Sequence, residues 1–101
     1  MPLLTVAVAP AADRVVVRLA GEADLSTRSV LDQGLREAAA AGHPVEVDLG
    51  DVTFFDYSCL GTLGAFTARL GASGRTCRLV GVPPRTQRII DLAGLGDLLA
   101  S

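Results

Sequence analysis

Hydrophobic residues recur along this chain with two different periods, and each change of period marks a new element. Residues 45–49 alternate between apolar and acidic side chains, which is the period of a half-buried strand. Two earlier segments, 3–8 and 14–20, are rich in valine and leucine, which suit a pleated surface. A turn over 10–13 separates them, and a fourth strand is expected over 75–81.

Three other segments carry apolar residues at helical spacing. A glycine inside a helix costs roughly 1 kcal/mol relative to alanine. We therefore expect Gly34 in the first helix, and Gly61 and Gly64 in the second, to mark places where the helix approaches its neighbour closely. The first expected helix is capped by Ser26 or Thr27 and ends near Ala41. The second is capped by Ser58 and ends near Gly71, and the third begins at Pro84 and ends at Gly94.

The resulting order, β-β-α-β-α-β-α, predicts an α/β fold. A strand-helix-strand unit joins parallel neighbours by a right-handed crossover, whereas the first two strands form a hairpin. We expect a mixed sheet of four strands, or slightly more, with about three helices that cover at least one face. Because 101 residues is the size of one ordinary domain, residues 1–101 are expected to form a single domain.

Composition narrows the functional classes. Half of the residues are hydrophobic and 20% are charged, as in a globular domain. The net charge is −2 and the nine basic residues, all arginine, form no stripe, which argues against nucleic-acid binding. No apolar run approaches the roughly 20 residues that span a bilayer, and the N-terminus lacks a basic signal region. We therefore expect a cytoplasmic protein that does not act at a membrane.

The most informative stretch runs from Asp51 to Gly61, because it follows a strand and enters a helix. Ligand sites in open α/β sheets gather at such strand ends. Ser58 falls where the helix N–H groups are unpaired, which makes it a good N-cap. A phosphate on its hydroxyl would be well tolerated at the same place. Spacing alone leaves both interpretations open, a structural cap and a phosphorylation site.

Four segments carry a shared pattern. They are Leu19-Ala20-Gly21-Glu22-Ala23-Asp24, Asp48-Leu49, Asp51-Val52-Thr53-Phe54-Phe55-Asp56-Tyr57-Ser58-Cys59-Leu60-Gly61 and Arg88-Ile89-Ile90-Asp91-Leu92-Ala93-Gly94-Leu95. In this order and spacing they resemble the STAS domains, the family of anti-sigma factor antagonists. The third segment is similar to the family's signature loop, in which an acidic residue precedes Ser, Ser or Thr, Gly, Leu and Gly. The resemblance implies a STAS-like fold over roughly residues 14–95.

The function that this resemblance implies is partner switching. In the family, the unphosphorylated antagonist binds an anti-sigma factor, which then releases its sigma factor. That partner is often a serine kinase with a histidine-kinase-like ATPase fold, which phosphorylates the antagonist, and a PP2C-type phosphatase restores the binding form. We therefore expect an anti-sigma factor antagonist, not an enzyme. The alternative is a non-phosphorylated STAS scaffold or dimerisation module in a signalling complex.

The resemblance places the phosphorylation site at Ser58, the second hydroxyl position of the motif. A phosphate adds about −1.5 to −2 charge, which would add repulsion to an acidic surface. Two residues depart from the family pattern, since Tyr57 stands in place of serine and Cys59 in place of glycine, and both favour the alternative of a retained cap. The residues expected around the acceptor on the partner-binding surface are Asp24, Asp56, Tyr57, Cys59 and Leu60.

Cys59 itself has two interpretations. A thiol at a helix N-terminus can have a lowered pKa and a reactive thiolate, whereas most free cysteines fill space as small apolar side chains. A disulfide with Cys77 is not expected. Cys59 follows the end of one strand and Cys77 begins the parallel neighbour, so their Cα atoms should exceed the ~7 Å limit for a disulfide.

No catalytic or metal site is expected. A small enzyme with Ser58 or Cys59 as nucleophile is a third hypothesis, but it lacks a base, because the single histidine, His43, lies in a Gly-His-Pro turn. Glu22 and Asp24 would suit an acid-base pair, although a solvated loop is the simpler interpretation. One histidine and two cysteines do not assemble a metal site, and no glycine-rich phosphate loop calls for a nucleotide cofactor.

The end of the sequence adds one expectation. Many family members continue past the Gly-Leu segment with another strand and a final helix, which are short or absent here. An apolar face left uncovered in this way would favour a partner or a homodimer.

Overall fold

Four strands form one mixed sheet in the computed structural model, which describes residues 3–98. The elements are β1 (Leu4–Pro10), β2 (Val15–Ala23), α1 (Arg28–Ala39), β3 (Val45–Phe55), α2 (Tyr57–Ala72), β4 (Cys77–Val80), α3 (Pro84–Leu92) and a 3-10 turn over Gly96–Leu98. The strands lie side by side in chain order. β1 pairs antiparallel with β2, whereas β2 with β3 and β3 with β4 are parallel. The predicted α/β fold, element order and mixed sheet are confirmed.

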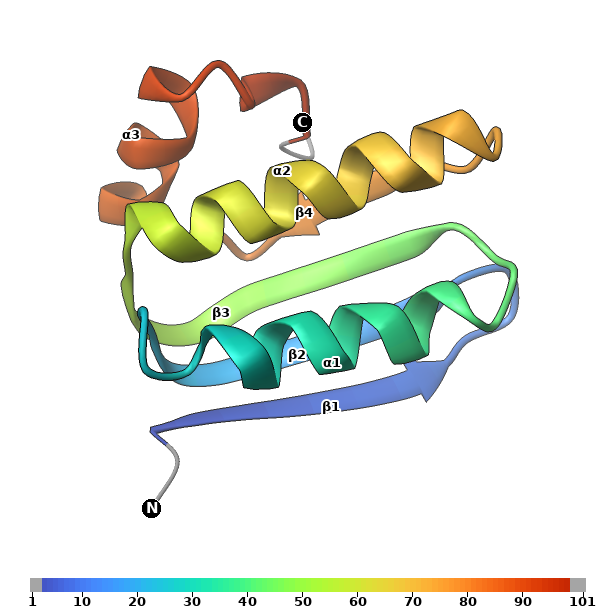
Figure 1. The fold of residues 1–101 in the computed structure, drawn as a ribbon, viewed down its shortest axis with the longest axis horizontal. Coiled ribbons are helices and arrows are strands. Elements are labelled where there is room, and N and C mark those ends of the chain that lie inside the picture. The colour runs from blue at the N-terminus through green and yellow to red at the C-terminus, as the bar shows by residue number, and fades with distance from the viewer. Residues whose placement is uncertain (1–2, 99–101) are drawn as a thin grey trace.

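The core lies between one face of the sheet and the helices α1 and α2, which run side by side across it (Figure 1). From Val15 to Leu19 in β2 and from Val45 to Leu49 in β3, every second residue points into this core, as the alternating pattern predicted. The opposite face carries charged side chains, including the partly exposed pairs Arg14–Glu46 and Arg18–Asp48. The buried residues of β2 and β3 are Val15, Val17, Leu19, Ala23, Val45, Val47, Leu49, Val52 and Phe55.

β2 and β3 are longer than their hydrophobic patterns indicated. β3 continues through Phe55, so the predicted loop over 51–56 is mostly strand, and β2 continues through Ala23. The two strands remain paired to their ends, with Ala23 opposite Phe55, because two register shifts absorb the irregular stretch around Gly21. The extension carries both candidate segments to the same edge of the sheet.

The prediction that helical glycines mark close packing against a neighbouring element is confirmed for Gly34 and wrong for Gly61. An added Cβ at Gly34 would lie 2.3 Å from Cγ1 of Val6 in β1, so this glycine lets α1 lie close to the sheet. An added Cβ at Gly61 would meet nothing within 4 Å, because that residue faces away from the core, and one at Gly64 would reach only Leu95, at 3.6 Å. Within residues 3–98, no helix has the length and apolar character needed to cross a bilayer.

Candidate functional site

The first turn of α2 is capped by Asp56, not by Ser58 as the sequence predicted. One Asp56 oxygen, Oδ1, accepts the backbone N–H groups of Ser58 (3.0 Å) and Cys59 (3.3 Å). A carboxylate satisfies two of the unpaired donors of the helix and also suits its positive end. The helix therefore begins two residues earlier than a cap at Ser58 predicted, at Tyr57.

This cap leaves the Ser58 hydroxyl free for another role. Ser58 is the second residue of α2 and is partly exposed, and its hydroxyl donates to the same Asp56 oxygen at 2.6 Å. One Asp56 oxygen thus accepts three hydrogen bonds. Two come from the helix backbone, and only the third comes from a side chain, the Ser58 hydroxyl. Removal of the hydroxyl would leave the two bonds from Asp56 to the helix backbone in place.

The loop between β2 and α1 is organised by a second aspartate. Asp24 Oδ1 accepts the hydroxyl of Ser26 (2.6 Å) and the backbone N–H groups of Ser26 (2.9 Å) and Thr27 (3.2 Å). These bonds, that of the Ser26 hydroxyl above all, lower the pKa of Asp24 below its ordinary value. The hydroxyl of Thr27, the buried N-cap residue of α1, donates to the Glu22 carbonyl at 2.8 Å. The loop therefore presents a fixed anionic side chain.

The structure brings these two loops together. The Asp56 N–H donates to the Ala23 carbonyl (3.0 Å), and the Cys59 thiol donates to the Asp24 carbonyl (3.4 Å). Asp24, which belongs to a different motif from Asp56 and Ser58, therefore joins them in one cluster at the carboxyl ends of β2 and β3. Ligand sites favour this edge of an open α/β sheet.

Two of the residues predicted for the binding surface lie in the core instead. Cys59 and Leu60 expose 0% and 2% of their surface, because the first turn of α2 turns both side chains into the hydrophobic core. Burial raises the pKa of the Cys59 thiol, the reverse of the shift that a reactive thiolate needs. Burial therefore favours the other interpretation, in which Cys59 packs as a small apolar side chain.

We expect Cys59 and Cys77 to resist alkylation in the folded protein. Both thiols are free and buried, and burial raises the pKa of Cys77 to about 12. At pH 8, iodoacetamide should modify each at least about a hundredfold more slowly than in the chain unfolded by urea, because reaction requires opening of the fold. Peptide mass mapping at timed intervals measures both rates. Rapid labelling of Cys59 alone in the folded protein would restore the reactive-thiol interpretation.

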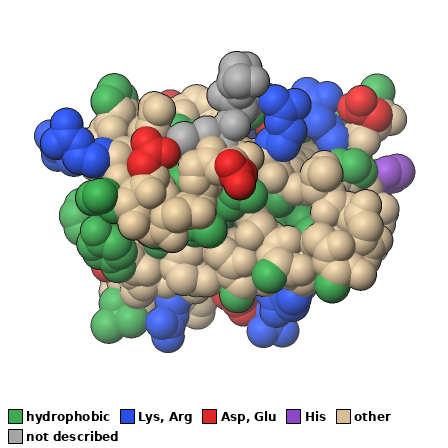
Figure 2. All heavy atoms as spheres, turned by 90° about the horizontal axis from the view of Figure 1, so that it is seen from above, with side chains coloured by type: hydrophobic (Ala, Val, Ile, Leu, Met, Phe, Trp, Pro, Cys, Tyr) green, Lys and Arg blue, Asp and Glu red, His purple; other side chains and the backbone are tan. Residues whose placement is uncertain are grey.

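Exposed hydrophobic side chains surround the cluster. Tyr57, predicted for this surface, exposes 63% of its area, and Leu25 and Phe54 expose 66% and 49%. They adjoin Asp24 and Asp56 in sequence, at the end of the molecule where α1 and α2 begin. Figure 2 shows hydrophobic side chains gathered at that end, on the left. The sequence reasoning missed Leu25 and Phe54, although a leucine between two polar residues and a second phenylalanine that breaks the strand alternation were available signals.

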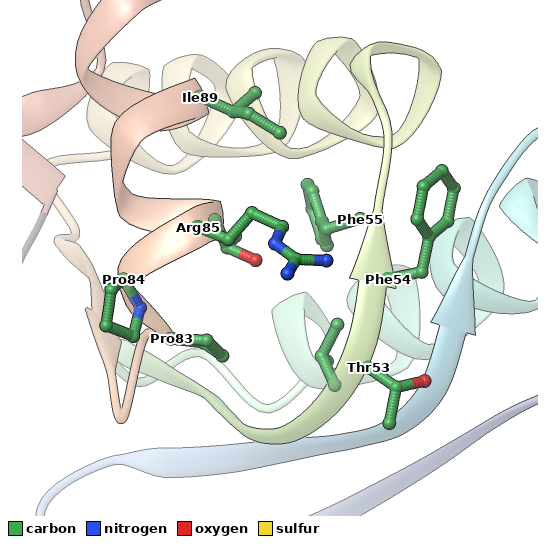
Figure 3. Close-up of a pocket in the computed structure, with 9 residues that line it drawn as sticks. Thr53, Phe54, Phe55, Pro83, Pro84, Arg85 and Ile89 are labelled. Carbon is green, nitrogen blue, oxygen red and sulfur yellow. The ribbon is translucent and has the colours of Figure 1, made fainter.

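A groove opens beside this surface, between the end of β3 and the start of α3. It encloses about 560 Å³, and Pro83, Pro84 and Ile89 form its α3 side. The Arg85 side chain reaches from α3 across the groove toward the segment that carries Phe54 and Phe55 (Figure 3). An arginine beside aromatic side chains in a concave surface is a composition typical of protein-binding sites.

The remaining candidate residues lie away from the cluster. His43 is exposed in the turn before β3, whereas Ser58 follows the far end of this 11-residue strand, so it does not serve Ser58 as a base. Cys77 pairs with Val45 at the beginning of β3, also at the opposite end from Cys59. Among residues 3–98, no group of three or more metal-ligating side chains is assembled.

Fold and cluster together define a class of protein, a small mixed-sheet α/β domain with an acidic and aromatic surface around a serine in the first turn of its second helix. The chain belongs to the STAS domain family, because the family model described as "Mlab, STAS domain" matches residues 6–100. This confirms the family that the four motifs indicated.

Relatives of known name and structure agree with the assignment. The anti-sigma-B factor antagonist of Staphylococcus epidermidis is 31% identical over 84 residues, 82% of this chain and 78% of that protein. The protein of the same name from Bacillus subtilis is 28% identical over 85 residues, 84% and 78% of the two chains. The crystal structure of an anti-sigma factor antagonist from Mycobacterium paratuberculosis superposes with a TM-score of 0.85 at 30% identity, covering 95% of this chain and 82% of that one. The phosphorylated form of the Bacillus protein SpoIIAA shares the fold, with a TM-score of 0.76 at 20% identity over 95% and 89% of the chains.

Proposed function

We propose that this protein is an anti-sigma factor antagonist that binds its anti-sigma factor through the surface around Ser58 and is released by phosphorylation of that serine. The observation that carries the proposal is the setting of Ser58, a partly exposed hydroxyl 2.6 Å from Asp56. Exposed Leu25, Phe54 and Tyr57 lie at the same end of the molecule. The names of the relatives support the class of partner.

The cap geometry supplies the physical basis of the switch. The Ser58 hydroxyl donates its proton to Asp56, and phosphorylation removes that donor. It also sets about −1.5 to −2 charge against the carboxylate, so Asp56 has to turn away. The backbone N–H groups of Ser58 and Cys59 then become available to the phosphate, which the helix N-terminus favours. One cap replaces the other, so the surface changes in shape and charge while α2 stays capped.

The unphosphorylated surface suits a protein partner. Leu25, Phe54 and Tyr57 supply exposed apolar and aromatic anchors, and such residues in the centre of an interface carry most of the binding energy. Asp24 and Asp56 add fixed acidic groups that suit basic side chains on the partner. In this proposal the partner is the family's serine kinase with a histidine-kinase-like ATPase fold, a PP2C-type phosphatase reverses the modification, and the protein acts in the cytoplasm without enzymatic activity of its own.

The proposal predicts that Ser58→Glu weakens capture of the partner by at least about tenfold. A fixed negative charge at this position repels the Asp56 carboxylate and changes the shape of the surface that the partner recognises. Tagged wild-type and variant proteins serve as baits in a lysate of the source organism, and quantitative mass spectrometry identifies ATPase-fold kinases among the retained proteins. Ser58→Ala should retain the partner. Ser73→Glu is the matched control, because Ser73 is an exposed residue at the other end of α2.

A second arm tests the modification directly. Wild type incubated with the captured kinase and ATP should gain the mass of one phosphate, located on Ser58 by peptide mapping, and Ser58→Ala should gain none. Equal capture by wild type and Ser58→Glu, without phosphorylation, would contradict the proposal and favour a STAS scaffold that is not phosphorylated.

A further inference from the structure

The outer edge of β1 carries backbone groups that point away from the sheet. In an antiparallel pair, each residue that bonds its neighbour alternates with one that does not. The Glu22 N–H donates to the Leu3 carbonyl (2.7 Å) at one end of the hairpin, and the Ala11 N–H donates to the Arg14 carbonyl (2.8 Å) at the other. The odd-numbered residues of β1 therefore bond β2, and the even-numbered residues direct their N–H and C=O groups outward. These outward residues are Leu4, Val6, Val8 and Pro10, of which Pro10 offers only a C=O.

This edge lacks the usual protection against strand pairing. Natural sheets guard an edge with charged side chains, bulges, proline or a very short strand. β1 has seven residues without a charge, its register with β2 is unbroken, and its one proline, Pro10, is the last residue. On the open face of the strand, the exposed side chains of Leu3, Thr5 and Ala7 are neutral. Within residues 3–98, no other segment pairs with this edge.

We propose that β1 pairs antiparallel with β1 of a second copy of this chain, about a two-fold axis at Val6. Leu4 then bonds Val8 of the second copy, Val6 bonds its own counterpart, and Val8 bonds Leu4. Two bonds for each of three residue pairs give six main-chain hydrogen bonds, and the two four-stranded sheets become one. Leu3, which is 53% exposed, comes to lie opposite Ala9 of the second copy and is partly covered.

A second copy fits this edge because the strand is complementary to itself. The register centred on Val6 leaves Pro10 outside the paired segment, whereas a shift that sets Pro10 opposite Leu4 of the second copy places its ring against a carbonyl. The nearest charged side chains on the open face are Arg18 and Glu22 in β2, opposite Ala7 and Leu3. The two Arg18 residues would be three strand spacings apart, about 14 Å, beyond the screening length in physiological salt. Six hydrogen bonds are fewer than the ~10 of a typical interface, so the dimer is weak and forms with rising concentration.

Sedimentation velocity over a concentration series tests the pairing. Wild type should shift from monomer to dimer, and Val8→Pro should raise the dimer dissociation constant about tenfold or more, because it removes two of the six bonds. The substitution leaves the β1–β2 bonds intact, since the Val8 N–H points outward. Val8→Thr keeps the N–H and should dimerise like wild type. A protein that stays monomeric up to about 1 mM, or a Val8→Pro variant that dimerises equally well, would overturn the proposal.

Cross-linking tests the register and does not depend on how Val8→Pro folds. The proposed register places Thr5 opposite Ala7 of the second copy in a pair without mutual hydrogen bonds, where Cα atoms lie about 4.5 Å apart and suit a disulfide. Mild oxidation of mixed Thr5→Cys and Ala7→Cys proteins should give the mixed dimer, while Ala9→Cys alone should give none. The native cysteines do not interfere because both are buried. Predominant Thr5→Cys or Ala7→Cys homodimers would show another register and overturn this one.

Discussion

Gly21→Ala should destabilise the protein by more than about 3 kcal/mol, a large share of the ~5–15 kcal/mol that holds an ordinary domain together. Gly21 has φ +105°, which L-residues rarely adopt, and an added Cβ would lie 2.0 Å from the Leu3 carbonyl oxygen. That oxygen is fixed, because it accepts the Glu22 N–H at 2.7 Å and joins β1 to β2. Relief of the clash therefore requires the hairpin to open at this end.

Urea and thermal unfolding followed by circular dichroism measure the loss. For a domain of this size, 3 kcal/mol corresponds to a fall in Tm of at least about 12 °C. Gly42→Ala is the matched control, because Gly42 has φ +80° but an added Cβ would meet nothing within 4 Å. It should cost only about 1 kcal/mol, the price of the left-handed conformation alone. Equal losses for the two variants would show that the Leu3 carbonyl yields and that backbone strain is the only cost.

Gly21 also explains where sequence reasoning failed. The periods of β1, β2 and β3 predicted the strands and their order, because burial on one face imposes alternation. The ends of β2 and β3 could not be predicted in that way, since Gly21 and the register shifts beside it interrupt the alternation while the backbone pairing continues. Alternation reports burial of side chains, and the last residues of both strands are held by main-chain hydrogen bonds.

The candidate site was predicted in part for a similar reason. The motif pointed to Ser58, Asp56 and Asp24, and the structure brings their segments together through bonds to the Ala23 and Asp24 carbonyls. Which side chains of the first turn of α2 face outward depends on where the helix begins. The Asp56 cap starts the helix at Tyr57 and thereby buries Cys59 and Leu60. A cap preference alone did not choose between Asp56 and Ser58, because both residue types are good N-caps.

Gly34→Ala and Gly61→Ala should change stability in opposite directions, although the sequence gives the two helical glycines the same appearance. Alanine at Gly61 enters open space and should add about 0.5–1 kcal/mol through helix propensity. Alanine at Gly34 sets its Cβ 2.3 Å from Cγ1 of Val6, a side chain with little rotamer freedom. Overpacking of a filled core costs about 1–3 kcal/mol, so the variant should lose about 1–2 kcal/mol net.

The double variant Gly34→Ala with Val6→Ala isolates the contact on which this difference rests. Val6→Ala removes Cγ1, the methyl group that the new Cβ would strike at 2.3 Å. The two substitutions should therefore couple favourably by about 1–2 kcal/mol in a double-mutant cycle measured by urea unfolding. Measurement at low protein concentration keeps dimerisation through β1 out of the result. Additive effects, or a Gly34→Ala variant as stable as Gly61→Ala, would show that α1 does not rest directly on β1. In that case Gly34 would be dispensable for the packing that joins the helix to the edge strand.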